Sequence, residues 1–408
     1  MSELKRLMDT LCPDGVEYKE LREIAEYSKN RVSMTELNAG NYVGVDNLLP
    51  NEGGKKDAVY IPEEGRAIQF VEGDILIGNI RPYLRKIWLA EYAGGTNGDV
   101  LPIHITRPDK ILPKYLYYIL SSHDFWYYDV QHSKGAKMPR GSKSEVMKYR
   151  FPVPPLAVQS EIVRLLDNFT ALTAALTAEL AARKTQYEHY RDALLTFPAP
   201  ADDTALASKQ ASKQASRLSD VVRWLPLGKI CTRQKGISIT ARMMRDMDSP
   251  EGTVKIFAGG NTIAYIEAKN IPAQSVIDKP SIIVKSRGNI GFEYYDRPFS
   301  HKNEMWSYSI KSNDVLLKFI YYYLKKNTDY FQRKAKSGKL PQISISDTDN
   351  FAIPVPLLVE QERIVAILDK FDALVNDISR GLPAEIEARK KQYAYYRDRL
   401  LDFREKRA

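Results

Sequence analysis

The sequence predicts an α+β protein in which two mixed α/β modules are joined by two long helices that pair as an antiparallel coiled coil, with a pseudo-two-fold internal repeat. Three observations predict this class. The chain has 408 residues, enough for more than one domain. A long helical pattern occurs once in each half, nearly unchanged. The segment before each helical pattern contains short alternating apolar runs bounded by Gly, Pro and Asn, which is typical of strands.

The composition is that of a folded protein, with 44% apolar and 27% charged residues. The formal net charge of +9 permits a nucleic-acid partner but does not establish one. Only two cysteines and five histidines are present, which argues against a disulfide framework and against a zinc site. The N-terminal segment lacks an apolar signal core, and no run approaches the roughly 18 apolar residues of a membrane span. We therefore expect a cytoplasmic protein with no membrane partner.

The two variable modules are expected at residues 1–151 and 219–353. Alternating apolar runs predict strands in both modules, within residues 73–80, 99–105, 281–291 and 300–310. A helix is expected in each module, at 115–130 and at 318–332. Between the halves, residues 198–218 are of low complexity, with two ASKQ tetrads, and are expected to form a linker.

The repeated segments follow the variable modules. Residues 152–172 (PVPPLAVQSEIVRLLDNFTAL) recur as 354–374 (PVPLLVEQERIVAILDKFDAL). Residues 183–197 (RKTQYEHYRDALLTF) recur as 389–403 (RKKQYAYYRDRLLDF). A repeat of this length indicates a duplicated domain pair, since it is far longer than the repeat of a solenoid.

Both repeated segments, 152–197 and 354–408, are predicted to be helical because apolar and aromatic residues recur at steps of three and four. The stripe in the first copy is interrupted at Arg183. A long helix with one apolar stripe needs a partner, and the most economical arrangement pairs the two copies with each other. The alternative is that each helix packs on its own module. The residues expected to pair the helices or to dock a partner are Leu166, Phe169, Leu172, Tyr187, Tyr190, Leu368, Phe371, Leu374, Tyr393 and Tyr396.

The two helical copies differ at one point. The second copy contains Gly381 and Pro383, and a proline there must kink or break the helix. The first copy has no such residues and is four residues shorter at this point. We therefore expect one continuous helix in the first half and an interrupted one in the second.

Catalytic signatures are absent from the sequence. It contains no GxxxxGK[ST] loop, no GxGxxG turn after a strand, no HExxH and no Asn-Pro-Pro-Tyr tetrapeptide. We therefore assign no catalytic and no metal-binding residue, and expect no cofactor on this chain.

Basic loops occupy matched places in the two halves. Residues 129–150 hold six Lys and Arg against two acids, and residues 325–342 hold six against one. Lys and Arg suit phosphate neutralisation, whereas Arg and Asn also make paired hydrogen bonds to base edges. Singly, such loops are more often solvated surface, but their recurrence at matched positions favours a function. The candidate DNA-binding residues are Asn79, Arg81, Arg85, Lys86, Lys134, Lys137, Arg140, Lys143, Lys285, Arg287, Asn289, Lys302, Arg333, Lys334, Lys336 and Lys339. Among them, Arg81 and Arg287 are candidates for reading bases because each lies beside a Gly-Asn turn.

The helical motifs EIVRLLDNFTALTAALTAEL and RKTQYEHYRDALLTF, repeated as ERIVAILDKFDAL and RKKQYAYYRDRLLDF, resemble the conserved regions of the specificity subunit of Type I restriction–modification systems. The resemblance covers the whole chain in layout and the helices in actual residues. It implies a non-catalytic DNA reader whose two target-recognition domains, 1–151 and 219–353, each recognise half of a bipartite, asymmetric site in double-stranded DNA. The helices at 152–197 and 354–408 would space these domains and dock two modification (methyltransferase) subunits, with restriction (endonuclease and translocase) subunits joining them. S-adenosylmethionine, ATP and magnesium would belong to those partners.

Two other functions remain open at this point. A stand-alone DNA methyltransferase or nuclease would require a cofactor or metal motif that the sequence lacks. A coiled-coil scaffold without DNA specificity explains the helices but not two duplicated basic modules.

Overall fold

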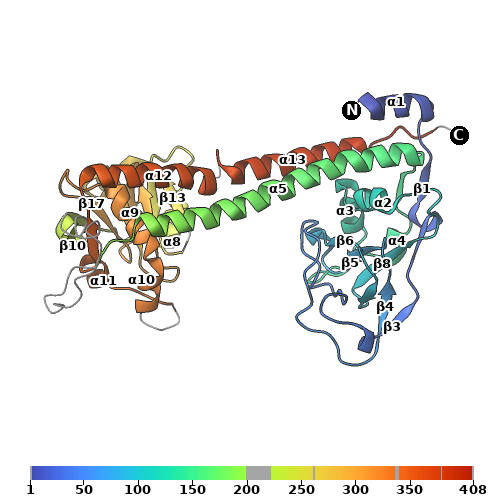
Figure 1. Ribbon diagram of the computed structural model, residues 1–408, viewed down its shortest axis with the longest axis horizontal. Coiled ribbons are helices and arrows are strands. Elements are labelled where there is room, and N and C mark those ends of the chain that lie inside the picture. Colours follow the sequence, from blue (N-terminus) through green and yellow to red (C-terminus); the bar gives the residue numbers. More distant parts are fainter. Residues whose placement is uncertain (1, 199–221, 261, 336–339, 378, 407–408) are drawn as a thin grey trace, which may run out of the picture. The chain divides into compact units, whose positions relative to one another are not determined.

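The structure is a computed structural model that describes residues 2–198, 222–260, 262–335, 340–377 and 379–406. The expected linker at 198–218 lies outside these residues, apart from Pro198. The chain divides into two compact units (Figure 1). Unit 1 contains residues 1–178 and 385–408, and unit 2 contains residues 179–384. Each unit therefore contains parts of both repeated helical segments.

Unit 1 is built on a four-stranded sheet of order β2-β8-β5-β6 and a three-stranded sheet formed by β3, β4 and β7. The four-stranded sheet consists of β2 (Ala25–Tyr27), β8 (Val100–Ile105), β5 (Ile75–Gly78) and β6 (Ile87–Leu89). The smaller sheet consists of β3 (Arg31–Ser33), β4 (Arg66–Phe70) and β7 (Gly94–Thr96). The strand pair β1 (Tyr18–Glu20) and β9 (Arg150–Pro152) completes the strands. The helices are α1 (Ser2–Leu11), α2 (Pro113–Leu120), α3 (His123–Gln131), α4 (Lys143–Val146), the first part of α5 (Leu156–Leu194) and nearly all of α13 (Leu382–Leu400).

Unit 2 repeats the topology of the four-stranded sheet, whereas its three-stranded sheet has its first strand in the centre and one parallel pair, β12 with β16. Its four-stranded sheet has the order β11-β17-β14-β15, and its three-stranded sheet has the order β13-β12-β16. The strands are β10 (Arg223–Pro226), β11 (Cys231–Lys235), β12 (Val254–Phe257), β13 (Ile263–Ile266), β14 (Ser281–Lys285), β15 (Gly291–Tyr295), β16 (Phe299–His301), β17 (Trp306–Ile310) and β18 (Ala352–Val355). The helices are α7 (Leu227–Ile230), α8 (Ala241–Met247), α9 (Leu317–Lys326), α10 (Thr328–Lys334), α11 (Ile345–Asp349) and α12 (Leu358–Asn376), with the end of α5. The predicted mixed α/β class is confirmed in both halves.

Several boundaries differ from the sequence prediction. Each expected module helix is two helices: α2 and α3 replace 115–130, and α9 and α10 replace 318–332. Ser122 is the N-cap of α3, because its hydroxyl accepts a hydrogen bond from the Phe125 amide (3.3 Å). The run expected as one strand at 300–310 is divided between β16 and β17, which lie in different sheets.

One buried glutamine in each repeat fixes a long helix to its own module. Gln159 accepts from the Leu112 amide (2.9 Å) and donates to the Pro154 carbonyl (2.7 Å). Gln361 makes the same bonds to Leu316 (2.8 Å) and Pro356 (2.8 Å). Both glutamines are fully buried, so these bonds satisfy polar groups that would otherwise destabilise the core.

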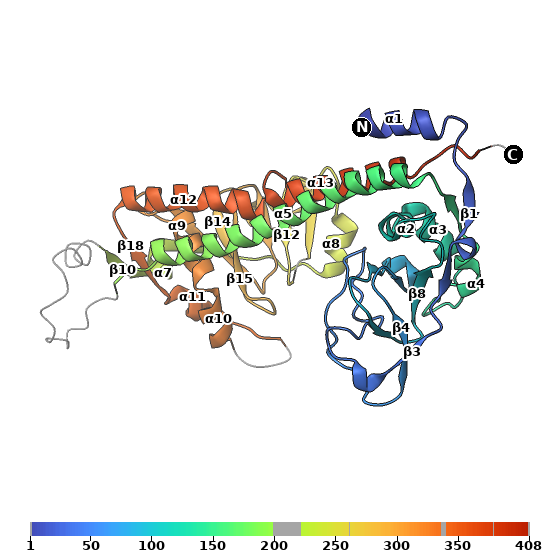
Figure 2. The same ribbon diagram turned by 45° about the vertical axis from the view of Figure 1, so that its right-hand side comes forward.

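The long helices also pair with each other, as the stripe predicted. In unit 1, α13 runs antiparallel to the first part of α5 (Figure 1). The Phe169 and Tyr396 rings of these two helices stack with their centroids 5.4 Å apart. In unit 2, Tyr190 stacks on Phe371 of α12 at 5.5 Å. Figure 2 shows α12 lying along α9 of the same unit. Each long helix therefore uses one part of its surface for a module and another for the second helix.

The predicted break in the second copy is confirmed. Helix α12 ends at Asn376 and α13 begins at Leu382, whereas α5 is continuous over 39 residues. A Cβ at Gly381 would lie 2.5 Å from the Ala373 carbonyl oxygen, so only glycine fits where the chain folds back onto the end of α12.

Candidate nucleic-acid interface

Two of the predicted basic segments in unit 1 are joined by backbone hydrogen bonds. The Arg81 amide donates to the Pro139 carbonyl (2.7 Å), and the Gly141 amide donates to the Asn79 carbonyl (3.0 Å). Ile80 and Arg140 face each other between these bonds as an antiparallel bridge. We call residues 79–81 with 139–141 the first clamp. It brings together basic side chains from segments about sixty positions apart in the sequence.

The same arrangement occurs in unit 2. The Gly288 amide donates to the Pro341 carbonyl (2.8 Å), and the Ile343 amide donates to the Ser286 carbonyl (3.0 Å). Arg287 and Gln342 form the bridge between them. We call residues 286–288 with 341–343 the second clamp. Because the clamps are made by backbone atoms, their side chains are free to differ between the two units.

The first clamp presents an exposed set of cations. Arg81 is exposed and has a left-handed backbone (φ 54°), a conformation that is uncommon for a residue other than glycine. The Lys134 and Arg140 backbones form a reciprocal pair of hydrogen bonds, both 2.9 Å long, which closes the loop between them. The exposed cations predicted on this loop and just after it are Lys134, Lys137, Arg140 and Lys143. An Arg140 guanidinium nitrogen lies 3.4 Å from Asp99 Oδ1.

Three of the predicted residues in unit 1 are placed differently. Asn79 is buried, with 5% of its surface exposed. Lys86 is half-buried and donates to the Val45 carbonyl (2.6 Å), and burial lowers the pKa of its amine. Arg85 is half-buried with a left-handed backbone (φ 51°). These positions favour a role in holding the loop over a role on its surface.

The predicted residues of unit 2 fall into three groups. Arg287 and Asn289 are exposed at the second clamp, and Arg333 and Lys334 are exposed on α10. Lys285 and Lys302 are half-buried and form ion pairs with Glu293 (2.8 Å) and Glu304 (3.0 Å). Lys336 and Lys339 lie outside the described residues.

The two arginines proposed to read bases do not occupy equivalent positions. The clamp register matches Arg81 with Gly288 and matches Arg287 with Ile80. Both were chosen because each lies beside a Gly-Asn turn in the local sequence, whereas equivalence between the two units is set by pairing with a distant loop.

A buried acid that was not predicted from the sequence lies beneath the first clamp. Asp129 on α3 is 1% exposed, and neither of its carboxylate oxygens has a hydrogen-bond partner among the described residues. Burial raises the pKa of Asp129 to about 6. A Cβ at Gly141 would lie 2.5 Å from Asp129 Oδ1 and 3.0 Å from Asn79 Oδ1. The signal in the sequence is that Asp129 directly follows the aromatic run FWYY of α3.

The residues predicted for helix pairing or partner docking differ in how much of each side chain is exposed. Leu166 and Leu368 are fully buried in the cores of their units. Phe169, Tyr396, Tyr190, Tyr187 and Phe371 make the aromatic contacts between long helices. Tyr393 packs against the core of unit 1. Leu172 and Leu374 remain 43% and 39% exposed.

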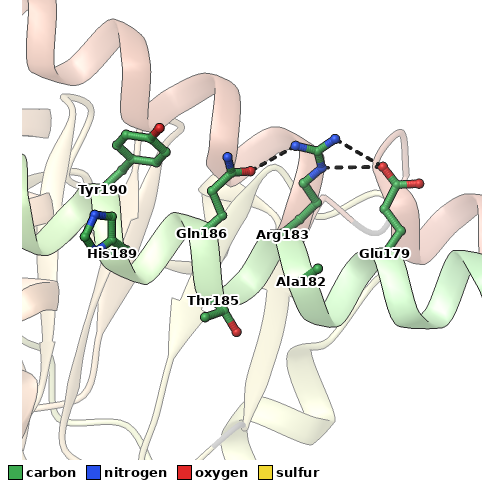
Figure 3. Close-up of a pocket in the computed structure, with 7 residues that line it drawn as sticks. All are labelled: Glu179, Ala182, Arg183, Thr185, Gln186, His189 and Tyr190. Atoms are coloured by element: carbon green, nitrogen blue, oxygen red, sulfur yellow. Dashed lines mark hydrogen bonds and ion pairs between the residues drawn. The ribbon is translucent and has the colours of Figure 1, made fainter.

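A shallow hollow lies along the second part of α5 in unit 2, and all its lining residues belong to that helix (Figure 3). They are Glu179, Ala182, Arg183, Thr185, Gln186, His189 and Tyr190. Arg183 donates to Gln186 (2.9 Å) and to Glu179 (3.4 Å), which accounts for the polar interruption of the apolar stripe. Arg389 repeats this pattern with Gln392 (2.7 Å) and Glu385 (2.8 Å) in unit 1. A hollow lined by one helix is a surface feature, not an enclosed ligand cavity.

Within the described residues, no three His, Cys, Asp or Glu side chains lie close enough together to hold a metal ion. No helix in the described ranges has the length and apolarity needed to cross a lipid bilayer.

Comparison with known proteins identifies the family. The model of the Type I restriction modification DNA specificity domain matches residues 13–183 and again residues 227–388. The chain is 35% identical over 324 residues to the Type I restriction enzyme EcoR124I/EcoR124II specificity subunit of Escherichia coli, covering 72% of each chain. Its fold is similar to the crystal structure of the S subunit of a Type I restriction–modification system from M. genitalium, with a TM-score of 0.57, 15% identity and coverage of 95% of this chain and 96% of that chain. A chain from a study of complex assembly and conformational transition of the type I R-M system also has a TM-score of 0.57, at 20% identity, with coverage of 95% and 97%.

Each half of the chain thus matches one specificity domain, and each half contains one clamp. The chain belongs to the family of Type I restriction–modification DNA specificity subunits, the non-catalytic members of these systems.

Proposed function

We propose that each half of this specificity subunit reads one half of a bipartite, asymmetric site in double-stranded DNA through its clamp. The observation that carries this proposal is the pair of clamps, which have the same backbone register and different side chains. A constant backbone frame with variable side chains is suited to reading different base sequences from the same docking geometry. Sequence is read by side chains at base edges, whereas backbone frames and phosphate contacts set position.

The exposed cations around each clamp supply the phosphate contacts. In unit 1 these are Lys134, Lys137, Arg140 and Lys143, and in unit 2 they include Arg333 and Lys334 on α10. Lys and Arg that neutralise phosphates provide affinity without regard to sequence. Arg81 and Arg287 lie within the clamp segments 79–81 and 286–288, and they are our candidates for base contact.

The long helices supply the docking surface for two modification (methyltransferase) subunits, with restriction subunits joining them. Leu172, Leu374 and Tyr190 are large apolar residues that remain substantially exposed on these helices. S-adenosylmethionine, ATP and magnesium belong to the partner subunits in this proposal. The complex works in the cytoplasm, in keeping with the two cysteines of this chain, which are free and buried.

Domain exchange tests the proposal. We divide the chain into target-recognition domains at 1–151 and 219–353, conserved helices at 152–197 and 354–408, and a linker at 198–218. Residues 1–151 are replaced by the corresponding domain of another family member, and the methylated sites are mapped genome-wide in cells that also express the modification subunit. We expect one half-site to change and the other to stay intact.

The reciprocal exchange of residues 219–353 is the matched control and should change only the other half-site. An exchange that rewrites both half-sites would contradict independent recognition by the two halves. Methylation that shows no sequence preference in the wild-type complex would contradict the proposed function itself.

A further inference from the structure

One large, exposed apolar residue lies directly before the paired proline of each clamp. Met138 is 46% exposed and immediately precedes Pro139, and Leu340 is 55% exposed and immediately precedes Pro341. Single exposed apolar residues are common on protein surfaces and need no explanation. Here an exposed apolar residue precedes the paired proline in both loops, after a lysine in each sequence, whereas the two residues that follow each proline differ.

The clamp holds the backbone at both positions. The Pro139 carbonyl accepts from the Arg81 amide (2.7 Å), and the Pro341 carbonyl accepts from the Gly288 amide (2.8 Å). A residue that precedes proline is also restricted to extended conformations. Met138 and Leu340 are therefore presented from a fixed backbone, which lowers the entropy that a contact through them would cost.

The surroundings of these side chains are cationic. Met138 lies between Lys137 and Arg140 in sequence, and all three are exposed. In unit 2, Leu340 Cδ2 lies 3.8 Å from the position that a Cβ on Gly288 would occupy, next to the exposed Arg287. An apolar tip framed by cations matches duplex DNA, where phosphates flank the apolar faces and methyl groups of the bases.

We infer that Met138 and Leu340 are specificity-determining residues that contact bases, one in each half-site. The flanking cations bind phosphates and bring each apolar side chain against a thymine methyl group or the edge of a base step. This inference rests on the proposed function, and it adds which side chains discriminate between sequences. A protein partner on the same tips is the competing occupant.

The test uses Met138→Ala and Leu340→Ala in the complex with the modification subunit. Methylated sites are mapped genome-wide, and binding is measured on the wild-type site and on duplexes with single substituted base pairs at several salt concentrations. We expect each variant to lose about tenfold in discrimination at one or two adjacent positions of a single half-site. The slope of binding against salt should stay unchanged because no phosphate contact is removed.

Matched controls come from the same units. Val59→Ala in unit 1 (96% exposed) and Met243→Ala in unit 2 (47% exposed) remove apolar side chains outside the clamps and should leave discrimination as in the wild type. Met138→Leu and Leu340→Met keep an apolar side chain and should retain most of the discrimination.

Wild-type discrimination at every position in both alanine variants, with binding intact, would overturn the inference. Weakened assembly with the modification subunit at unchanged discrimination would also overturn it, because it would assign the tips to a protein partner. A wild-type complex without sequence preference would reject the proposed function, and this inference with it.

Discussion

Asp129 is a buried acid beneath the first clamp, and the second clamp has an apolar residue at the matched position. Pro139 and Pro341 occupy matched positions in the two clamps. Alignment of the two units on these prolines places Phe331 at the position of Asp129 and Ile343 at the position of Gly141. Phe331 and Ile343 are fully buried apolar residues, so the second clamp rests on an ordinary core. The first clamp rests on a carboxyl group without a partner among the described residues. Such a group destabilises the fold when it is ionised.

Asp129→Asn should stabilise unit 1 at high pH and have little effect at low pH. Burial raises the folded-state pKa of Asp129 to about 6, above its usual value near 4. Between these pH values the folded state binds more protons than the unfolded state, so this group favours folding at low pH and that contribution is lost as the pH rises through about 6. The shift corresponds to a gain on the order of 2–3 kcal/mol for the asparagine variant at pH 8. Denaturant unfolding of both proteins at pH 4.5 and pH 8 measures the difference. A gain that is equal at both pH values would contradict an ionisable origin.

Arg397 forms a buried ion pair between the C-terminal helix and a loop of unit 1. Its side chain is 3% exposed, and Nη1 lies 2.7 Å from Glu52 Oε2. The Glu52 amide in turn donates to the Arg85 carbonyl (2.9 Å), shortly after residues 79–81 of the first clamp in the chain. The pair thus holds this loop against α13.

Arg397→Met should lower the free energy of unfolding of unit 1 by about 3 kcal/mol, because it leaves the buried Glu52 without its cation. Arg191 occupies the matched position in the first repeat and pairs with the more exposed Asp192 (2.9 Å). The control Arg191→Met should therefore cost only about 0–1 kcal/mol. Urea unfolding of both variants gives the comparison, and Glu52→Gln together with Arg397→Met should recover part of the loss. Equal destabilisation by the two arginine variants would contradict a special contribution from the Glu52 pair.

At the scale of elements, the loop closed by Lys134 and Arg140 concentrates exposed positive charge beside the first clamp. The exposed cations here are Lys134, Lys137, Arg140 and Lys143. Among the described residues, Arg140 is the one member that forms an ion pair, and its partner is Asp99. Surface cations without strong partners are available for phosphates, and their contribution appears in the salt dependence of binding.

Replacing Lys134, Lys137, Arg140 and Lys143 with Gln should weaken DNA binding and flatten its dependence on salt. Removing one phosphate contact lowers the magnitude of the log–log salt slope by about 0.9. The measurement is affinity for the cognate duplex at several salt concentrations. Replacing Lys5 and Lys110, which are exposed in the same unit away from the clamp, is the control and should leave the slope unchanged. An unchanged slope in the fourfold variant would place these residues on ordinary solvated surface.

At the scale of the whole molecule, the beginning and the end of the chain belong to the same unit. Val16 forms a backbone bridge with Glu405, and the Tyr18 hydroxyl donates to the Phe403 carbonyl (2.8 Å). Helix α5 starts in unit 1 and ends in unit 2 without a break, whereas α12 and α13 are separate helices. The chain therefore passes between the two units within α5 and again within the first turn of α13, just after the break that follows α12.

Inserting a TAEL tetrad after Leu180 should lengthen the non-specific spacer between the two half-sites by about one to two base pairs and leave both half-sites unchanged. Four residues add about 6 Å of helix and rotate the stripe by only about 40°. Double-stranded DNA rises about 3.4 Å per base pair. A two-residue insertion turns the stripe away from its partner and should abolish assembly. Genome-wide mapping of methylated sites measures the spacer, and an unchanged spacer with full activity would show that this helix does not set the distance.

The features that depend on local pattern could be predicted from the sequence. The steps of three and four predicted both long helices and their pairing, and Gly381 with Pro383 predicted the break between α12 and α13. The alternating runs predicted the mixed α/β class of both modules, and the helical motifs predicted the family. These features are readable because helix period, strand alternation and proline geometry depend on residues close together in the chain.

Which basic residues lie next to one another follows from the folding of remote segments onto each other. Arg81 lies beside Pro139 only because two remote loops close a backbone clamp, and the same closure makes Arg287 equivalent to Ile80 instead of Arg81. The folded structure also buries Asn79 and Asp129, although Asn and Asp are residue types that usually lie on the surface. No local pattern encodes these outcomes, since each depends on hydrogen bonds and packing between segments whose separation in sequence carries no periodic signal.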